Sequence, residues 1–255
     1  MTLSKGSLYL VPNTLDFGTT EANAPIGDVL PGSVLRTAAR LTDWVAENAK
    51  TTRAFLKRVD AVVPLAQALQ SIAIIELPRP SKGAKVAPPA DLTALLAPAQ
   101  AGRDLGLISE AGLPGVADPG AALVQAAHAA GIRVVALAGP SSLLLALAAS
   151  GLNGQSFAFV GYLPVDADSR AARIRELEAV SRRASQTQLM IETPYRNAAL
   201  MSALIAHLQP TALLSVSCGL TLSSGFTRTC AVRDWRASPS ALPADVPAVF
   251  ALLAA

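Results

Sequence analysis

The stretch that decides the fold runs from Asp104 to Gly120 and reads D-L-G-L-I-S-E-A-G-L-P-G-V-A-D-P-G. Its first six residues form a short apolar run, which predicts a buried strand. The rest is a loop rich in glycine and proline that leads into an apolar helix expected to end near Ala130. Ligands of open α/β sheets bind at the carboxyl ends of parallel strands. The loop is therefore either a ligand-binding loop or a structural turn.

Two acidic residues of this loop have local interpretations. Glu110 could accept hydrogen bonds from a ribose or an amine. Asp118 precedes Pro119 and is expected to cap the following helix, with the proline at the first helical position. The loop thus offers both a polar group for a ligand and an ordinary helix start.

The same order of strand, loop and helix extends over the first 150 residues. Successive units of this kind imply parallel strands joined by right-handed crossovers. The apolar runs 132–137 and 143–149 predict a strand buried on both faces and a buried helix. The expected strands are residues 7–11, 43–47, 72–76, 104–109 and 132–137. The expected helices are residues 33–41 (capped by Ser33), 50–57, 91–101 (capped by Asp91), 120–130 and 143–149.

The pattern changes after Gly151. One charged amphipathic helix and a second helix now alternate with apolar segments, and the last three of these segments are typical of a more antiparallel sheet. The expected strands are residues 157–160, 188–192, 212–217, 226–232 and 248–253, and the helices 168–183 and 195–208. We therefore expect an α/β protein of two αβα domains, residues 1–152 with a mostly parallel sheet and residues 153–255 with a mixed one.

The composition excludes several classes of protein. Of 255 residues, 51% are hydrophobic and only 15% charged, which argues against disorder. The mean hydropathy of +0.41 raises the possibility of a membrane protein. However, the longest uncharged run, between Arg133 and Asp166, is interrupted by glycine and proline, and its apolar core is far shorter than the ~20 residues of a spanning helix. No membrane span and no export signal are expected.

Cysteine and histidine are too scarce for a disulfide framework or a zinc site. Two cysteines and two histidines fit a reduced cytoplasmic compartment and no bound metal. The net charge of +3 is too small to establish nucleic-acid binding, and the isoelectric point near 9.1 is a weak hint of it. No G-x-G-x-x-G, Walker A or G-x-S-x-G motif occurs.

Two further motifs follow expected strands. In Gly139-Pro140-Ser141-Ser142, one serine could cap the next helix, and the same helix start could offer amides and a hydroxyl to a ligand. In Glu192-Thr193-Pro194-Tyr195-Arg196, the glutamate ends an apolar strand and could face a cleft.

Together these motifs resemble the tetrapyrrole methylase superfamily of S-adenosylmethionine-dependent methyltransferases, in particular the branch that includes the small-subunit ribosomal RNA cytidine ribose-2′-O-methyltransferase. The S-D-A-G-T-P-x-x-x-D-P-G of that branch stands here as Ser109–Pro114 and Asp118–Gly120. Its G-P-S-A, S-G-L, G-F-L-P and E-S-P-H-R stand as residues 139–142, 150–152, 161–164 and 192–196. Its A-T-P-I-G-N-L and A-E-D-T-R-x-T are altered here, at Val11–Asp16 and Ala46–Arg53.

The resemblance implies a homodimer that binds S-adenosylmethionine between its two domains. The residues expected to contact this cofactor are Pro12, Ser109, Glu110, Ala111, Gly112, Leu113, Gly115, Pro140, Ser141, Ser142, Met190 and Ile191. The implied activity is O-methylation of RNA resembling ribosomal RNA. There are two alternatives: a cofactor-binding protein without catalysis, and a methyltransferase that acts on a small molecule such as a tetrapyrrole.

Methyl transfer to a hydroxyl requires alignment and a proton acceptor. Glu47 is the first candidate for that base and Glu192 the second, with Arg53 as a further catalytic residue. The expected substrate-binding residues are Asn48, Lys50, Arg196 and Arg228. RNA phosphates would meet a basic cluster of Lys50, Arg53, Lys57 and Arg58, unless these residues form only a solvated helix face.

Overall fold

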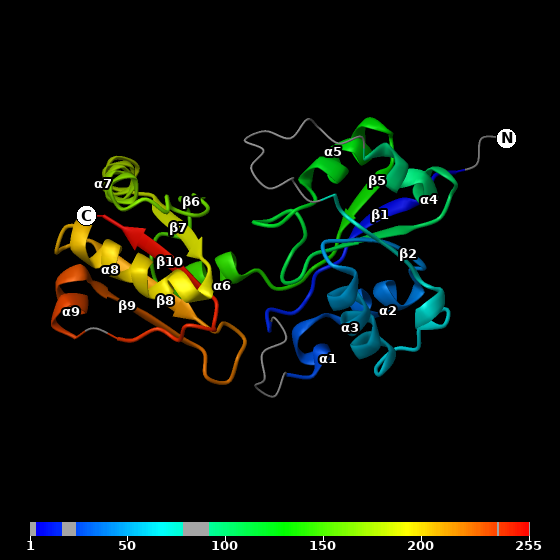
Figure 1. Cartoon of the computed structure of the whole chain (residues 1–255), viewed down its shortest axis with the longest axis horizontal. Coiled ribbons are helices and arrows are strands. Elements are labelled where there is room, and N and C mark those ends of the chain that lie inside the picture. Colours follow the sequence, from blue (N-terminus) through cyan, green and yellow to red (C-terminus); the bar gives the residue numbers. More distant parts are fainter. Residues whose placement is uncertain (1–3, 17–23, 79–91, 239, 255) are drawn as a thin grey trace. The chain divides into compact units, whose positions relative to one another are not determined.

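The computed structural model describes residues 4–16, 24–78, 92–238 and 240–254, which form two compact units, residues 1–140 and 141–255. Figure 1 shows that each unit has its own sheet with helices packed on it. The fold class expected from the sequence, two α/β units with a mostly parallel and a mixed sheet, is confirmed.

The first unit contains a five-stranded sheet in the order β3-β2-β4-β1-β5, and every pair of neighbours is parallel. Its strands are β1 Ser7–Leu10, β2 Asp43–Ala46, β3 Ala73–Glu76, β4 Leu105–Ile108 and β5 Arg133–Ala136. Its helices are α1 Ile26–Val29, α2 Gly32–Arg40, α3 Ala49–Asp60, η1 Leu69–Ser71, η2 Thr93–Leu96, α4 Ala97–Gln100 and α5 Ala121–Ala129. All five expected strands form, and the expected parallel arrangement is confirmed.

Strand alternation divides the core of this unit into two layers. On β4, Leu105 and Leu107 pack with residues of α4 and α5, whereas Ile108 packs with Trp44 and with α1, α2 and α3. Side chains of successive strand residues point to opposite faces, so a sheet covered on both sides needs apolar residues at every position. β4 is buried at all four positions, as this arrangement requires.

Three local expectations for this unit are corrected. The run 132–137 is not buried on both faces, because β5 lies at the sheet edge and leaves Arg133 and Ala136 exposed. Ser33 does not cap α2, whose N-cap position is Pro31. A 3₁₀ turn and the four-residue α4 replace the helix expected through Ala101, and its expected cap Asp91 lies outside the described residues.

The second unit contains a mixed sheet in the order β6-β7-β10-β8-β9. Only β6 and β7 are parallel; the other three pairs are antiparallel. The strands are β6 Phe157–Phe159, β7 Thr187–Glu192, β8 Leu213–Cys218, β9 Phe226–Ala231 and β10 Ala248–Leu253. The helices are α6 Ser142–Ser150, α7 Ala167–Ala184, η3 Pro194–Arg196, α8 Asn197–His207 and α9 Val232–Ala237.

Helix α6 accounts for the difference between the expected and observed unit boundaries. Leu143, Ala146 and Leu147 pack on Leu189 and Val249 of the second sheet, so α6 belongs to the second unit. The division therefore falls after residue 140 and not after residue 152. The expected full burial of this helix is also corrected, since Leu144 is 53% exposed and Leu145 is 38% exposed.

None of the described helices combines the length and apolar character that a membrane crossing requires.

Candidate functional site

Three loops of the first unit follow the carboxyl ends of the adjacent strands β1, β4 and β5. We call them the first loop (residues 11–16), the second loop (residues 109–120) and the third loop (residues 137–140). Because neighbouring parallel strands end at the same edge of a sheet, these loops lie side by side. These loops contain most of the residues that the sequence singled out as cofactor contacts.

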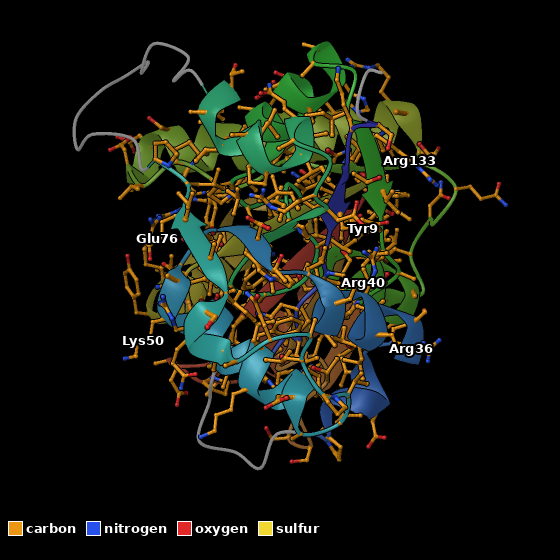
Figure 2. The ribbon with its side chains drawn as sticks, turned by 90° about the vertical axis from the view of Figure 1, so that its right-hand side faces the viewer. Tyr9, Arg36, Arg40, Lys50, Glu76 and Arg133 are labelled. Carbon is orange, nitrogen blue, oxygen red and sulfur yellow. The ribbon has the colours of Figure 1, made fainter. Side chains whose placement is uncertain are left out.

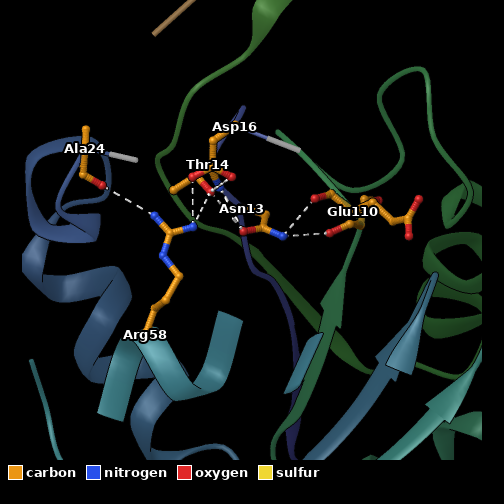
Figure 3. A network of polar contacts seen from close by, with 7 residues as sticks. Asn13, Thr14, Asp16, Ala24, Arg58 and Glu110 are labelled. Atoms are coloured by element: carbon orange, nitrogen blue, oxygen red, sulfur yellow. Dashed lines mark hydrogen bonds and ion pairs between the residues drawn. The ribbon is translucent and has the colours of Figure 1, made fainter. Parts of the chain in front are cut away.

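Asn13 joins the first loop to the second. Its backbone nitrogen donates to Gly112 O over 2.9 Å, and its side-chain Nδ2 donates to Glu110 O over 2.9 Å and Ser109 O over 3.3 Å. Figure 3 shows the amide spanning the gap to the second loop. Asn13 is 6% exposed, so these bonds are shielded from water. The sequence reasoning missed Asn13, whose only signal was its place after a strand and Pro12.

A close approach of backbones joins the first loop to the third. A Cβ atom added to Gly139 would lie 2.2 Å from Cβ of Pro12, so only glycine fits there. The second loop also reaches the third, because a Cβ on Gly112 would lie 3.6 Å from Pro140 O. Pro12, Gly112 and Pro140, which the family resemblance relates to one ligand, are thus brought together.

The second loop turns back on itself through residues with positive φ. These are Gly112 at 64°, Gly115 at 80° and Gly120 at 134°, and also Ala117 at 64°. A non-glycine residue in this region carries roughly 1–2 kcal/mol of strain. Strained backbone of this kind clusters at binding sites. The expected cofactor residues Ala111 and Leu113 belong to the same turn, in which Val116 N donates to Leu113 O over 3.2 Å.

The charges of two glutamates, Glu47 and Glu110, act on Asp118 at this edge. Glu47, which follows β2, accepts a hydrogen bond at Oε2 from Glu110 N over 3.0 Å. Burial, and to a smaller extent the negative charges of Glu47 and Glu110, raise the pKa of Asp118 to about 7. The expectation that Asp118 caps a helix is wrong, because the N-cap position of α5 is Gly120. The site is therefore strongly acidic, and a positively charged ligand would relieve the repulsion.

Ser109, the residue before Glu110, has a buried hydroxyl group. The residue is 4% exposed, and its Oγ has no hydrogen-bond partner among the described residues. A buried hydroxyl without a partner costs free energy unless a ligand or water completes its hydrogen bonds. Across the described ranges, no three His, Cys, Asp or Glu side chains are grouped so that they could hold a metal ion.

Arg58 of α3 holds the first loop and does not extend freely into solvent. Its guanidinium donates to Thr14 Oγ1 over 3.1 Å and to Asp16 Oδ2 over 2.8 Å, and reaches Ala24 O at 3.5 Å (Figure 3). The expected basic cluster is therefore reduced to Lys50, Arg53 and Lys57, which are exposed and spaced along one helix face. Arg58 therefore positions the first loop.

Asn48, expected to bind substrate, is the N-cap of α3. Its Oδ1 accepts from Lys50 N over 2.9 Å and from Thr51 N over 3.3 Å. Glu76 accepts from Ala49 N over 2.7 Å at the same helix start. These hydrogen bonds fix the start of α3 just after Glu47. They therefore orient the helix that carries Lys50 and Arg53.

The expected site residues of the second unit are committed to internal contacts. Glu192, whose side chain is 1% exposed, pairs with Arg196 over 2.9 Å and accepts from Thr193 N over 2.8 Å. Met190 is fully buried in the core, and its neighbour Ile191 faces the opposite side of β7. Arg228 stacks over Trp235 at 4.0 Å and donates to Ser238 O and Ser240 Oγ.

Ser141 and Ser142 start α6 at the beginning of the second unit. Ser141 occupies the N-cap position and is 8% exposed, but its side chain makes no capping hydrogen bond to the helix. The expected role of a serine as the cap of this helix is therefore not realised through Ser141.

Comparison with known proteins places the chain in a family. The family model described as Tetrapyrrole (Corrin/Porphyrin) Methylases matches residues 36–222, most of the chain. The protein therefore belongs to the tetrapyrrole methylase family, as the motifs indicated.

Curated relatives point to one branch of that family. Ribosomal RNA small subunit methyltransferase I of Mesorhizobium japonicum is 44% identical over 114 residues, which is 45% of this chain and 37% of that protein. The protein of the same name from Streptococcus pyogenes serotype M1 is 34% identical over 196 residues, 76% of this chain and 58% of that protein. The matched regions thus span well under two thirds of these relatives' lengths.

Two solved structures share the fold over nearly the whole chain. Uroporphyrin-III-C-methyltransferase from Thermus thermophilus has a TM-score of 0.51 with 19% identity, covering 97% of this chain and 92% of its own. The methyltransferase CobJ has a TM-score of 0.56 with 19% identity, covering 98% and 95%.

Proposed function

We propose that this protein is an S-adenosylmethionine-dependent methyltransferase that methylates an oxygen atom of RNA resembling ribosomal RNA. The observation that carries the proposal is the acidic edge of the first unit, where Asn13 and Gly139 join three loops around Glu47, Glu110 and Asp118. The family and the names of the curated relatives support the same reaction and the same substrate class.

The residues present fit the cofactor. S-adenosylmethionine carries a sulfonium and an ammonium group, and both positive charges suit a site of crowded carboxylates. The unpaired Oγ of Ser109 and the backbone of Glu110 to Gly115 supply hydrogen-bonding groups for its polar parts. The cofactor, when bound, supplies a methyl group already activated for transfer to a nucleophile.

Glu47 is the proposed proton acceptor for the attacking hydroxyl. It occupies the same edge as the second loop and is held in place by Glu110 N through one of its oxygens. Glu192 is a weaker candidate, because its carboxylate is buried and already paired with Arg196. Lys50 and Arg53, exposed on the helix that begins beside Glu47, are proposed to bind phosphates of the substrate.

We also propose that the protein forms a homodimer and acts in the cytoplasm. The exposed Leu144 and Leu145 of α6 support self-association, since adjacent large apolar side chains on a surface often mark an interface.

The test combines cofactor binding with transfer of a labelled methyl group. We expect S-adenosylmethionine to bind in the micromolar range by isothermal titration, more tightly at pH 8 than at pH 6 because Asp118 ionises between them. S-adenosylhomocysteine, which lacks the sulfonium charge, should show a smaller dependence on pH. With labelled cofactor, the label should enter RNA and not protein or small metabolites, and Glu47→Gln should bind the cofactor but lose transfer.

Four results would each contradict a different part of the proposal. An absence of heat and of a thermal shift at saturating cofactor would remove the cofactor assignment. Binding without transfer to any pool would indicate a cofactor-binding protein, and label in small metabolites would indicate a small-molecule methyltransferase. Full turnover by Glu47→Gln would exclude Glu47 as the base.

A further inference from the structure

A second group of basic side chains lies along the β5 side of the first unit, separate from the α3 cluster. Arg36 and Arg40 are four residues apart on the exposed face of α2, and Arg133 opens the edge strand β5 beside Ser7 of β1. Figure 2 shows Tyr9, Arg40, Arg36 and Arg133 on the same side of the unit, with Lys50 on the other side. We call these four residues the β5-side patch.

Arg40 is held in a defined orientation at the centre of the patch. Its guanidinium carbon lies 4.7 Å from the centre of the Tyr9 ring, and its Nη1 lies 2.5 Å from Asp104 Oδ2. Asp104 is itself fixed, because its other oxygen accepts from Ser7 N over 2.8 Å. The Arg40 side chain nevertheless remains 47% exposed. A stacked arginine loses less conformational freedom when it binds a further partner.

Arg36 and Arg133 are available for an external anion. Both are exposed, and within the described part of the chain neither makes an ion pair or a side-chain hydrogen bond. Arginine presents donors that match two oxygens of a phosphate at once. The patch therefore combines one oriented guanidinium group with two that make no ion pair with any described residue, although the charge of Arg133 helps to lower the pKa of Asp104.

The distribution of charge in the first unit favours a polyanion on this layer. Helices α1, α2 and α3, which cover one face of the sheet, contain six Lys or Arg residues and two acidic residues, Asp28 and Asp60. Helices α4 and α5, which cover the opposite face, contain neither lysine nor arginine. Because the whole chain has a net charge of only +3, this asymmetry is a local feature.

We propose that Tyr9, Arg36, Arg40 and Arg133 form a second RNA-binding surface, which holds the phosphate backbone of the substrate away from the reacting group. This inference rests on the proposed action on RNA and extends it. A duplex or stem carries phosphates along its length, so it can offer phosphates to a surface away from the reacting group. Contacts to phosphates position a nucleic acid without reading its bases.

The test measures RNA affinity of the full chain as a function of salt. The variant Arg36→Gln/Arg133→Gln removes two charges of the patch and leaves the Arg40–Asp104 pair intact. The matched control is Arg175→Gln/Arg183→Gln, which removes two exposed arginines from α7 in the second unit. Fluorescence anisotropy with a labelled RNA stem-loop at several potassium chloride concentrations gives both the Kd and its salt slope.

We expect the Arg36/Arg133 variant to bind the stem-loop about ten-fold more weakly at low salt, with a salt slope reduced by about 1.5 to 2. The control should bind within about two-fold of the wild type, because it loses the same net charge at a place outside the proposed surface. Arg40→Lys should weaken binding by less than the double variant does, since it keeps the charge but loses the stacked, forked geometry. Cofactor affinity and thermal stability of the double variant should match the wild type, which excludes misfolding.

Equal losses in the variant and the control, or no loss in either, would overturn the second surface while leaving cofactor binding and methyl transfer to RNA intact. If wild-type protein binds no RNA and transfers no methyl group to it, the proposed substrate fails and the surface fails with it. Arginine-dependent binding to vesicles of phosphatidylglycerol in place of RNA would also overturn the inference, in favour of a membrane surface.

Discussion

The carboxyl group of Asp118 shows how position alone changes the chemistry of a residue. It is partly buried near Glu47 and Glu110, and its pKa of about 7 lies well above the ordinary value for aspartate. Between about pH 4 and pH 7 the folded protein therefore keeps a proton that the unfolded chain has released. The contribution of Asp118 to stability is lost as the pH rises through this window.

We expect Asp118→Asn to unfold less readily than the wild type at pH 8, because the amide has no charge to bury. Its gain in the free energy of unfolding should be about 1–2 kcal/mol after allowance for solvent screening, and should disappear near pH 4. Urea denaturation of the cofactor-free protein at pH 4, 6 and 8 measures this difference.

Asp166 provides a control of opposite sign. Hydrogen bonds from Ser169 lower the pKa of Asp166, which caps α7. Asp166→Asn should therefore be less stable than the wild type at pH 8, and the two should converge as the pH falls. A constant difference between Asp118→Asn and wild type across the pH range would contradict the assigned environment of Asp118.

At the scale of the element, α3 links the acidic edge to the exposed basic cluster. Asn48 caps the helix, Arg58 near its end ties down the first loop, and Lys50 and Arg53 lie between them on the outside. A shift of the helix start would move all of these together. The cap is therefore a positioning device for the proposed substrate contacts.

Asn48→Ala should lower the free energy of unfolding by about 1 kcal/mol, because two amides of the first turn lose their acceptor. Asn48→Asp should keep most of that stability, since aspartate caps equally well. Thermal denaturation measures both changes, and Ser33→Ala is the control because Ser33 makes no capping bond in α2. Wild-type stability in Asn48→Ala would refute the capping role.

At the scale of the whole molecule, each unit has central strands protected by neighbours on both sides. β4 lies between β2 and β1, and β10 lies between β7 and β8. β5 has one neighbouring strand and two exposed positions. Amides at a sheet edge open to solvent more easily than those inside it.

Hydrogen exchange followed by mass spectrometry should therefore show slow exchange in peptides covering β4 and β10, and faster exchange in the peptide covering β5. The protected peptides act as internal references for each unit. Exchange in β5 as slow as that in β4 would mean that another chain or segment covers this edge in solution.

Local sequence was a reliable guide wherever a residue's neighbours along the chain determine its structure. Apolar runs and the turns between them predicted the strands, the parallel direction of those in the first sheet and the antiparallel pairs of the second. The sequence of residues 143–149 does not show which unit this helix belongs to, because an apolar helix can pack on either sheet.

The sequence by itself determined the family, the fold class and the loops around the acidic edge, because these depend on motifs and periodicity. Tertiary structure alone decided what the polar side chains do. Arg58, Arg228 and Glu192 each find an internal partner, and Arg40 stacks on Tyr9. Burial, and the charges of Glu47 and Glu110, raise the pKa of Asp118. The physical reason is that charge and hydrogen bonding depend on distances between atoms, which only folding sets.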